Sequence, residues 1–403
     1  MEELSEPAPT VVTKGSTLKL RNTAMPTIPA IAAAALAAAL SVVLAACGSS
    51  SSGHVAAARH PVSPFLNKLH SFSQVASTVP ANGDVNPYGI AVVPASAGRL
   101  VAGDTLVSNF NDKANVQGTG NTIVQVSRSG SSRLFAQIGK LPAGMACPGG
   151  VGLTTALGIL PGGWVVVGSL PTAAGGALPG VNPAGCLIVL NDQGSPVKTI
   201  TNSHISGPWD LAVSSSATSA TVFVSNALGG NTSVHDGVPV AGKCTVVRLD
   251  LALGATAPPM LTSSTVIGSG YPWIANKAAL VLAPTGLALG RNRTLYVDDT
   301  QTNAISAIPA ALTRTTAVAA SGSTIFAGGA LNAPLGMTMA PNGDLVVVNG
   351  NDGSAVEVTP SGKQVATKTL VKNGAGDLFG LTTTSRGLLL VNDGTNALDL
   401  YRG

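Results

Sequence analysis

Short apolar runs recur along this chain in a fixed order, with polar and glycine-containing turns between them. The clearest units open with a Pro-x-Gly-apolar phrase, continue with an apolar run that ends in Asn or Asp, and close with a third apolar run. The clearest copy occupies residues 334–358, and another occupies residues 284–308. Apolar runs of this length between turn residues predict buried β-strands. Their repetition predicts an architecture built from copies of one small sheet.

Several such units follow one another along the chain. Each supplies two or three clear strands and leaves room for an outer fourth, and a spacing of roughly fifty residues is that of one propeller blade. Valine, threonine, serine and glycine outnumber glutamate and lysine, which argues against long helices. We therefore predict an all-β fold, a six-bladed β-propeller over residues 65–403. The units open near Asn86, Gly149, Gly207, Pro284, Pro334 and Leu378.

The last unit has no sequence for an outer strand, because the chain reaches Gly403 directly after its third strand. An open sheet edge is a liability, and a ring removes it by pairing the two ends of the chain. The segment 72–79, which precedes the first unit, is the expected donor of the missing strand. Deleting residues 65–80 is therefore expected to destabilise the whole domain.

The first fifty residues follow a different pattern. Basic residues up to Arg21 precede an apolar stretch at 28–43, and a Leu-Ala-Ala-Cys sequence ends at Cys47. This order resembles the signal and lipobox of bacterial lipoproteins, which implies cleavage before Cys47 and a lipid on its sulfur. An uncleaved transmembrane anchor and an ordinary signal peptide stay open as alternatives. We assign residues 1–46 to a lipoprotein signal peptide and residues 47–64 to a flexible tether.

These segments predict a lipid-anchored protein of the bacterial cell envelope. The sequence does not choose between an outer membrane and the outer face of a cytoplasmic membrane. Charged residues make up only 10% of the chain, and its net charge of +4 includes the basic leader. Since the sequence contains no basic cluster, we expect no nucleic acid among its partners. The membrane, reached through the lipid on Cys47, is one expected partner.

The cysteine content fits an oxidising compartment. With Cys47 assigned to the lipid, Cys147, Cys186 and Cys244 remain. Cys186 and Cys244 stand near the start of equivalent strands, and Cys147 precedes the unit that contains Cys186. We favour a Cys147–Cys186 disulfide with Cys244 free, and the other pairings stay open. No CxxC or His-Cys spacing accompanies these residues, so we predict no metal site there.

The Pro-x-Gly phrases and the segment 341–349 resemble the NHL-repeat type of β-propeller and its lactonase-like relatives. The resemblance covers about residues 70–403. It implies a ring of six blades with a funnel at one face. It implies no single activity, because such propellers include scaffolds, binding proteins, hydrolases and lyases.

Loop lengths point to one face of the ring as the functional one. The connections between second and third strands are long in the first three units and short in the last three, and long loops on one rim usually form a binding surface. Oxygen atoms at the strand ends of this face are suited to a hard cation such as Ca²⁺ or to sugar hydroxyls. The alternative is that these Asn and Asp residues close turns through their own backbone. The candidate ligand-binding residues are Tyr88, Asn109, Trp209, Asn226, Asp298, Asn349 and Asn392.

A possible catalytic group is confined to the third unit. His204 and Asp210 flank its start, and His235 lies in its long loop, so a His–Asp acid–base pair is a candidate. The metal-binding lactonases resembled here bring a glutamate to the first unit, where this chain has Asn86, and Glu357 is the one glutamate after the leader. We predict a non-catalytic binding or scaffold protein for an envelope protein, glycan or small molecule. A secreted hydrolase or lyase that uses the His/Asp group is the alternative.

Overall fold

The computed structural model describes residues 63–403, apart from 181–182, 231, 233–236 and 277–278. All of the described strands belong to one compact unit, Arg59–Gly403. The predicted signal peptide, most of the predicted tether and Cys47 lie outside the described residues. Within the part of the chain that is described, no helix is both long and apolar enough to cross a membrane.

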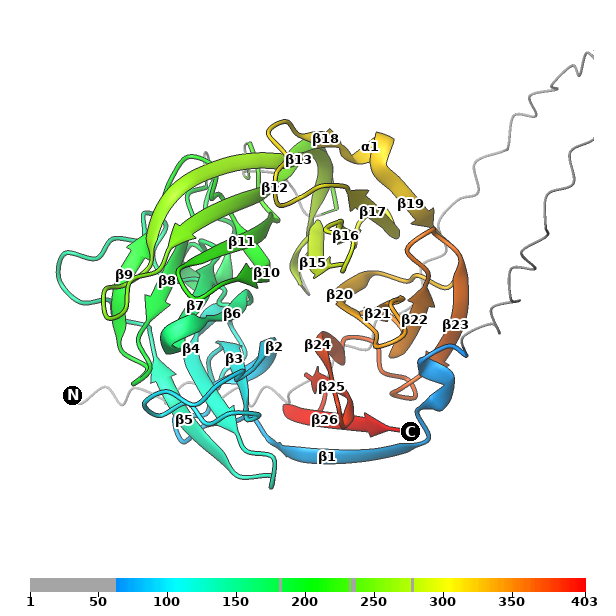
Figure 1. The fold of residues 1–403 in the computed structure, drawn as a ribbon, viewed down its shortest axis with the longest axis horizontal. Helices are drawn as coiled ribbons and strands as arrows, with labels where there is room; N and C mark the ends of the chain where they lie inside the picture. The colour runs from blue at the N-terminus through cyan, green and yellow to red at the C-terminus, as the bar shows by residue number, and fades with distance from the viewer. Residues whose placement is uncertain (1–62, 181–182, 231, 233–236, 277–278) are drawn as a thin grey trace, which may run out of the picture. The chain divides into compact units, whose positions relative to one another are not determined.

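Antiparallel sheets form the six blades of a ring, as the repeats predicted (Figure 1). Blade 1 consists of β2 (Val85–Val92), β3 (Thr105–Asn111), β4 (Gln117–Val126) and β5 (Ser132–Gln137). Blade 2 consists of β6 (Leu157–Leu160), β7 (Trp164–Ser169), β8 (Cys186–Leu190) and β9 (Pro196–Ile200). Blade 3 consists of β10 (Pro208–Ser215), β11 (Ser219–Asn226), β12 (Pro239–Ala252) and β13 (Met260–Asn276), with the short β14 (Leu280–Leu282) and β18 (Val318–Ala319) beside β13.

The remaining blades are closer to the four-stranded repeat. Blade 4 consists of β15 (Pro284–Leu289), β16 (Leu295–Asp299), β17 (Ala304–Ile308) and β19 (Thr324–Ala327). Blade 5 consists of β20 (Pro334–Met339), β21 (Leu345–Asn349), β22 (Ser354–Val358) and β23 (Gln364–Thr369). Blade 6 consists of β24 (Leu378–Thr384), β25 (Gly387–Asn392), β26 (Ala397–Arg402) and β1 (Ser71–Ser77). The described helical turns are η1 (Leu66–Lys68), η2 (Pro161–Gly163), η3 (Ala174–Gly176) and α1 (Ala320–Ser323).

The apolar runs form second strands that are buried on both faces, because each sheet packs between two neighbouring blades. Every residue of β7, β16 and β21 is buried. This explains why these strands read as continuous rather than alternating apolar runs. Where the inner strands converge, a Cβ on Gly336 would lie 2.3 Å from Phe379 O, and one on Gly380 would lie 2.0 Å from Tyr88 O. The Pro-x-Gly glycine therefore permits close approach between neighbouring inner strands.

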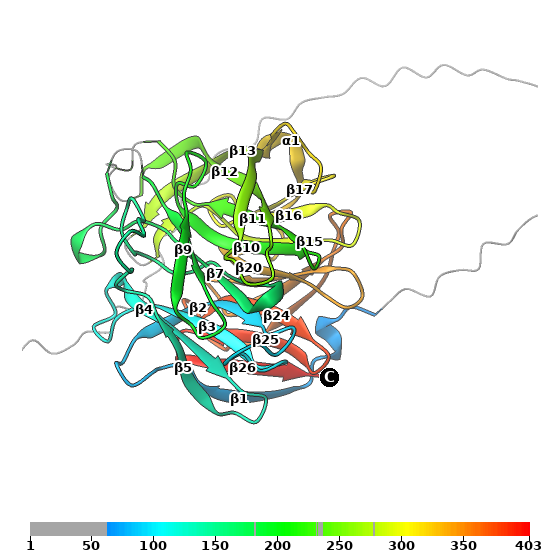
Figure 2. The ribbon, with the colours of Figure 1, turned by 60° about the vertical axis from the view of Figure 1, so that its left-hand side comes forward.

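The two ends of the propeller pair as predicted. β1 runs antiparallel to β26, from the pair Ser71–Arg402 to the pair Ser77–Ala397, and Figure 2 shows β1 at the outer edge of that sheet. Just before β1, the Phe65 and Leu66 N–H groups each donate to the Glu357 carboxylate of blade 5 at 2.8 Å. The chain is thus fastened to blade 5 before it completes blade 6.

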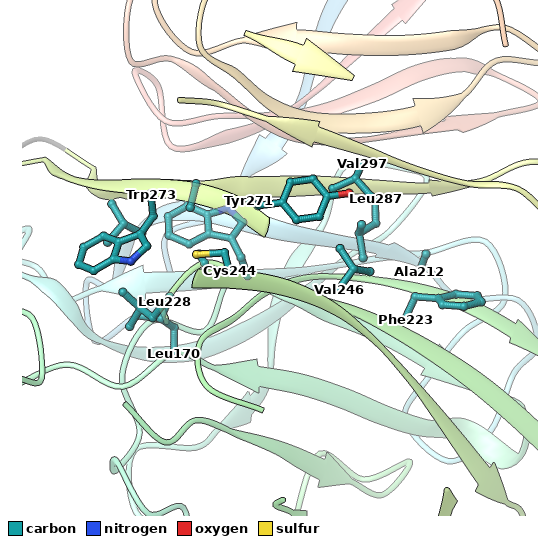
Figure 3. Packing of buried hydrophobic residues seen from close by; sticks show 14 of the residues in the cluster. Leu170, Ala212, Phe223, Leu228, Cys244, Val246, Tyr271, Trp273, Leu287 and Val297 are labelled. Carbon is teal, nitrogen blue, oxygen red and sulfur yellow. The ribbon is translucent and has the colours of Figure 1, made fainter. Parts of the chain in front are cut away.

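The cysteines of the propeller are paired as we favoured. Cys147 is bonded to Cys186 with a Cα–Cα distance of 5.4 Å, which ties the segment before blade 2 to β8. In the chain-entropy view, closing a loop of this size contributes on the order of 3–4 kcal/mol. Cys244 is free and buried in a core cluster that also contains Tyr271 and Leu228 (Figure 3). Burial raises the pKa of its thiol well above the ordinary value, so it is unreactive in the folded protein.

The ring has two distinct ends. We call the end at which the inner strands begin the loop face, and it carries the turns 112–116, 170–185 and 227–238. We call the opposite end the tether face, and it carries the turns 93–104, 127–131 and 385–386 and the segment 63–70 that leads into β1. The blade 1 loop is shorter than we predicted, because Asn111 and Gln117 extend the pairing of β3 with β4.

Candidate functional site

A cavity of about 410 Å³ lies between the inner strands of the ring. Its walls come from β2, β10, β15, β20 and β24, and they consist mainly of apolar side chains and strand backbone. The ionisable groups in this wall are Tyr88 and Asp210, and Thr338, Thr382 and Thr383 add hydroxyl groups. The cavity is therefore a channel whose exposed lining is mainly polar backbone and hydroxyl groups, with one carboxyl group among them.

Asp210 occupies a position that is glycine in most other blades. The strand pairing aligns Pro208 with Asn226 as it aligns Pro334 with Asn349, so Asp210 stands where blade 5 has Gly336. Its Oδ2 accepts the Leu287 N–H and its Oδ1 accepts the Leu211 N–H, both at 2.8 Å. In blade 3 the Asp210 carboxyl group thus bridges β10 and the next inner strand, β15. At the glycine position of blades 5 and 6, the backbones of neighbouring inner strands lie in direct contact instead.

A second carboxyl group lies behind this wall. Asp298, fully buried on β16, accepts the Gly286 N–H at 2.6 Å and the Thr285 hydroxyl at 2.5 Å through Oδ1. Its Oδ2 is buried and has no hydrogen-bond partner among the described residues. Consecutive N–H groups of β15, on Gly286 and Leu287, are therefore held by Asp298 and Asp210 respectively.

Burial dominates the electrostatics of this pair. Desolvation, together with the nearby Asp210 and Asp299 charges, raises the pKa of Asp298 to about 8, against the opposing effect of its hydrogen bonds from Thr285 and Gly286. Desolvation also raises the pKa of Asp210 to about 7, against the opposing effect of its backbone hydrogen bonds. Near neutral pH, Asp298 is therefore mainly protonated and Asp210 is close to its midpoint. A carboxyl group with this pKa is able to exchange a proton in the channel.

An aromatic cluster crosses the axis next to this pair. Tyr88 of blade 1 donates its hydroxyl to Leu335 O of blade 5 at 2.7 Å and accepts the indole N–H of Trp209 of blade 3 at 2.7 Å. The Tyr88 ring stacks on Phe379 with centroids 5.4 Å apart and meets Trp209 edge-on at 5.6 Å. Burial, with the Asp210 and Asp298 charges, raises the pKa of Tyr88 well above its ordinary value, so the hydroxyl stays a donor. These rings close the channel where the inner strands begin.

Tyr88 and Trp209, which we predicted as ligand-binding residues of the funnel, both lie at this end of the channel. Tyr88 lines the cavity and Trp209 does not, and both are buried and hydrogen-bonded to each other. The physical reason is that the Pro-x-Gly positions converge on the axis, where large rings from three blades meet and exclude solvent.

The strand-end amides also differ from the predicted ring of ligands. Asn226 Oδ1 accepts the Ser206 and Gly207 N–H groups, and Asn349 Oδ1 accepts the Asn332 N–H. Both amides are buried and bind backbone N–H groups of the segments that lead into their blades, as in the alternative interpretation that such residues close turns. Asn109 donates to Thr78 O, and Asn392 donates to Asp399 and accepts the Thr395 N–H. Asp298, as described above, faces Gly286 rather than the loop face.

The predicted His–Asp pair does not form between His204 and Asp210. His204 Nδ1 lies 2.8 Å from Ser264 Oγ on β13, whereas both Asp210 oxygens accept backbone N–H groups at the channel. His204 precedes the inner strand, so its side chain reaches the outer part of blade 3. His235, the third member of the predicted group, lies outside the described residues.

The described residues do not fit the metal site of the lactonases resembled here. Asn86, which stands in place of their glutamate, donates from Nδ2 to Asn115 Oδ1 and does not reach the channel lining. Within the part of the chain that is described, no three His, Cys, Asp or Glu side chains are grouped so that they could hold a metal ion. Ca²⁺ binding therefore stays a prediction from the sequence alone.

Sequence reasoning missed Asp298 as the partner of Asp210. Blade 4 has two consecutive acids, Asp298 and Asp299, where blades 1 and 3 have Ser-Asn and blade 5 has Val348 before Asn349. That departure from the repeat was visible in the sequence. Its meaning was not, because the hydrogen bonds depend on how blades 3 and 4 pack.

A separate cleft of about 350 Å³ opens between blades 1 and 2 on the loop face. Its walls are the β4 segment at 118–121 and the loop segment at 172–175, with glycine, threonine and alanine predominating. Asn121 Oδ1, at the wall of this cleft, has no hydrogen-bond partner among the described residues. The cleft thus presents hydroxyl, amide and backbone groups but no charged side chain.

Comparison with known proteins supports the fold and does not extend to activity. No protein-family model matches the chain, and no curated protein matches it. A gluconolactonase from Xanthomonas campestris matches with a TM-score of 0.50 and 12% identity, over 83% of this chain and 90% of that one. A catalytically inactive virginiamycin B lyase from Staphylococcus aureus matches with a TM-score of 0.45 and 16% identity, over 82% of this chain and 88% of that one. A PQQ-bound aldose sugar dehydrogenase from Streptomyces coelicolor matches with a TM-score of 0.48 and 14% identity, over 82% and 97% of the two chains.

At these identities the likeness shows the fold alone. The chain is a six-bladed β-propeller.

Proposed function

We propose that this protein is a lipid-anchored, extracytoplasmic binding or scaffold protein that holds its ligand on the loop face. The observation that carries the proposal is the closure of the axial channel by Tyr88 and Trp209. In a propeller whose axial entrance is filled by buried rings, the long loops of the rim are the surface left for recognition.

The cleft between blades 1 and 2 is the hollow that we assign to this role. Its glycines leave backbone groups accessible, and Thr119 and Thr172 add hydroxyl groups. Such a surface suits an uncharged polar ligand, such as a glycan or an extended peptide, more than an ionic one. The Asn121 carbonyl oxygen without a partner supports the same class of ligand, because it needs a donor.

The hydrolase or lyase alternative retains one supporting observation. Asp210 lies in the channel wall with its pKa raised to about 7, which suits a general acid or base. Neither His204 nor another described histidine lines the channel with it. Turnover of an ester or lactone that is lost in Asp210→Asn would favour this alternative over binding.

Site-specific photo-crosslinking in bacterial cells tests the binding proposal. A crosslinker replaces Ala174 in the loop-face cleft, and the matched control carries it at Ser129, an exposed position on the tether face. We expect a discrete adduct from position 174 only. The adduct should disappear when Ala173→Trp fills the cleft. Equal labelling from both positions, or an adduct that survives Ala173→Trp, would contradict the proposal.

A further inference from the structure

The arginines of the propeller gather at one of its two ends. Every arginine among the described residues lies in a turn of the tether face or within four residues of a strand end that meets this face. Arg128 lies between β4 and β5, Arg386 lies between β24 and β25, and Arg402 ends β26. Turns of the loop face carry acids and lysines together, among them Asp112, Asp393, Lys113 and Lys372. Arginine is thus confined to the tether face, whereas the loop face carries charges of both signs.

Three of these arginines form a connected group where blade 6 meets blade 1. Arg386 donates from Nη1 to Arg128 O at 3.0 Å. Partial burial, and then the Arg402 and Arg128 charges, lower the pKa of Arg386, which places Arg128 and Arg402 within electrostatic reach of Arg386. Arg128 and Arg402 are exposed. Like charges held together at a surface are stabilised when an anion binds to them.

The acids of the tether face do not neutralise this group. Asp104 accepts a hydrogen bond from Gln125 at 2.7 Å, and Glu357 is held by the segment before β1. The single salt bridge found among the described residues joins Arg248 to Asp250 in blade 3. The arginines at the junction of blades 6 and 1 thus remain free to attract an external anion.

Exposed apolar side chains accompany these charges. Phe72, which is 56% exposed, pairs across the strands with Tyr401, next to Arg402, and Val101 is 46% exposed in the turn that follows β2. A cleft of about 310 Å³ beside Val101 is lined by Ser127, Ser129, Ser131 and Arg133, with the Asp104 side chain in its wall. Serine hydroxyls and a guanidinium are donors for phosphate oxygens. Basic residues mixed with exposed apolar ones characterise surfaces that lie on membranes.

The chain also leaves the propeller at this face. The Phe65 and Leu66 N–H groups donate to Glu357, and the His70 N–H donates to Arg402 O at 2.6 Å. The predicted tether, residues 47–64, therefore joins the propeller at the face that carries the arginines. Fewer than about twenty residues separate Cys47 from this point, and a flexible chain of that length spans on the order of 25 Å. A lipid on Cys47 would therefore hold this end of the propeller near a bilayer.

We propose that the tether face docks on anionic phospholipid headgroups through Arg128, Arg386 and Arg402. The proposal rests on the lipid anchor of the proposed function for its biological setting. Two observations support it. Arginine is confined to the tether face, and exposed apolar side chains lie on the same face. In this orientation the loop face, with its cleft, points away from the membrane.

Vesicle binding tests this docking without the lipid anchor. Residues 59–403, the compact unit that contains every described strand, are sedimented with vesicles of phosphatidylcholine alone or with one quarter phosphatidylglycerol. We expect binding to the anionic vesicles only, and its loss at high salt. Each basic residue near an anionic surface contributes about fivefold in affinity, so Arg128→Gln combined with Arg402→Gln should weaken binding about 25-fold.

The matched control neutralises two exposed lysines of the loop face, Lys113→Gln with Lys372→Gln, and should leave vesicle binding within about twofold. Thermal unfolding of both variants checks that the fold is intact. Equal binding to neutral and anionic vesicles, or an equal loss in the loop-face variant, would overturn the proposal. Residues 59–403 lack Cys47, so vesicle binding is measured independently of lipidation. A negative vesicle result would overturn the docking proposal alone, and absence of lipid on Cys47 in cells would overturn the lipid anchor alone.

Discussion

Replacing Glu357 by alanine is expected to lower the free energy of unfolding of the propeller by about 3–5 kcal/mol. The carboxylate accepts the Phe65 and Leu66 N–H groups and the Asn342 side-chain N–H, each at 2.8 Å, in a fully buried position. Alanine leaves these donors buried without partners. It also releases the segment that leads into β1, so the ring loses part of its closure.

Urea denaturation of residues 59–403 measures this effect. Asp192→Ala is the matched control, since its carboxylate accepts only a weak side-chain contact from Gln193 at 3.3 Å, and it should change stability by less than about 0.5 kcal/mol. Deleting residues 65–80 should have the larger effect and abolish a cooperative transition. A Glu357→Ala variant within 1 kcal/mol of the unmodified domain would show that the N-terminal fastening does not hold the ring closed.

The stability of the propeller is expected to fall as the pH rises from about 5 to 8.5. The folded-state pKa values of Asp298, about 8, and Asp210, about 7, lie above those of the unfolded chain, about 3.9. Between these values the folded state binds more protons than the unfolded state, so stability decreases with rising pH. For Asp298 alone, the part of this decrease that falls between pH 5 and 8 is on the order of 4 kcal/mol.

Asp298→Asn isolates this contribution. Asparagine keeps an oxygen for the Thr285 hydroxyl and the Gly286 N–H but cannot ionise. We expect the variant to lose most of the decrease between pH 6 and 8.5, as measured by thermal unfolding across that range. Asp112→Asn on the loop face is the control and should keep the profile of the unmodified protein. A stability that is constant or rises over this pH range would refute the assignment of a proton to folded-state Asp298. Parallel stability profiles for Asp298→Asn and the unmodified protein would refute it equally.

The fold could be predicted from the sequence because its determinants are local and repeated. A glycine near the start of the inner strand, as at Gly336 and Gly380, marks where most neighbouring inner strands converge, and the apolar runs mark strands that are buried on both faces. The donor strand could be found because the last unit lacked one. These features need no knowledge of how the blades pack against one another.

The site could not be predicted in the same way, because it depends on contacts across the ring. Trp209 and Tyr88 are 121 residues apart, and their hydrogen bond exists only because blades 1 and 3 face the same axis. The amide of Asn226 was consistent with either a ligand or a turn until its partners were known. Arg128 and Arg386 form no basic run in the sequence, and it is the closure of blade 6 beside blade 1 that brings them together.

Lipid attachment to Cys47 is the central claim on which the membrane orientation and the envelope function depend. The most direct test expresses the full chain in a bacterial host with radiolabelled palmitate and compares it with Cys47→Ser. We expect a labelled, membrane-associated protein whose label is lost in Cys47→Ser, while Cys244→Ser keeps it because that thiol is buried in the core. An unlabelled protein released in soluble form, or equal labelling of the Cys47→Ser variant, would show that Cys47 carries no lipid.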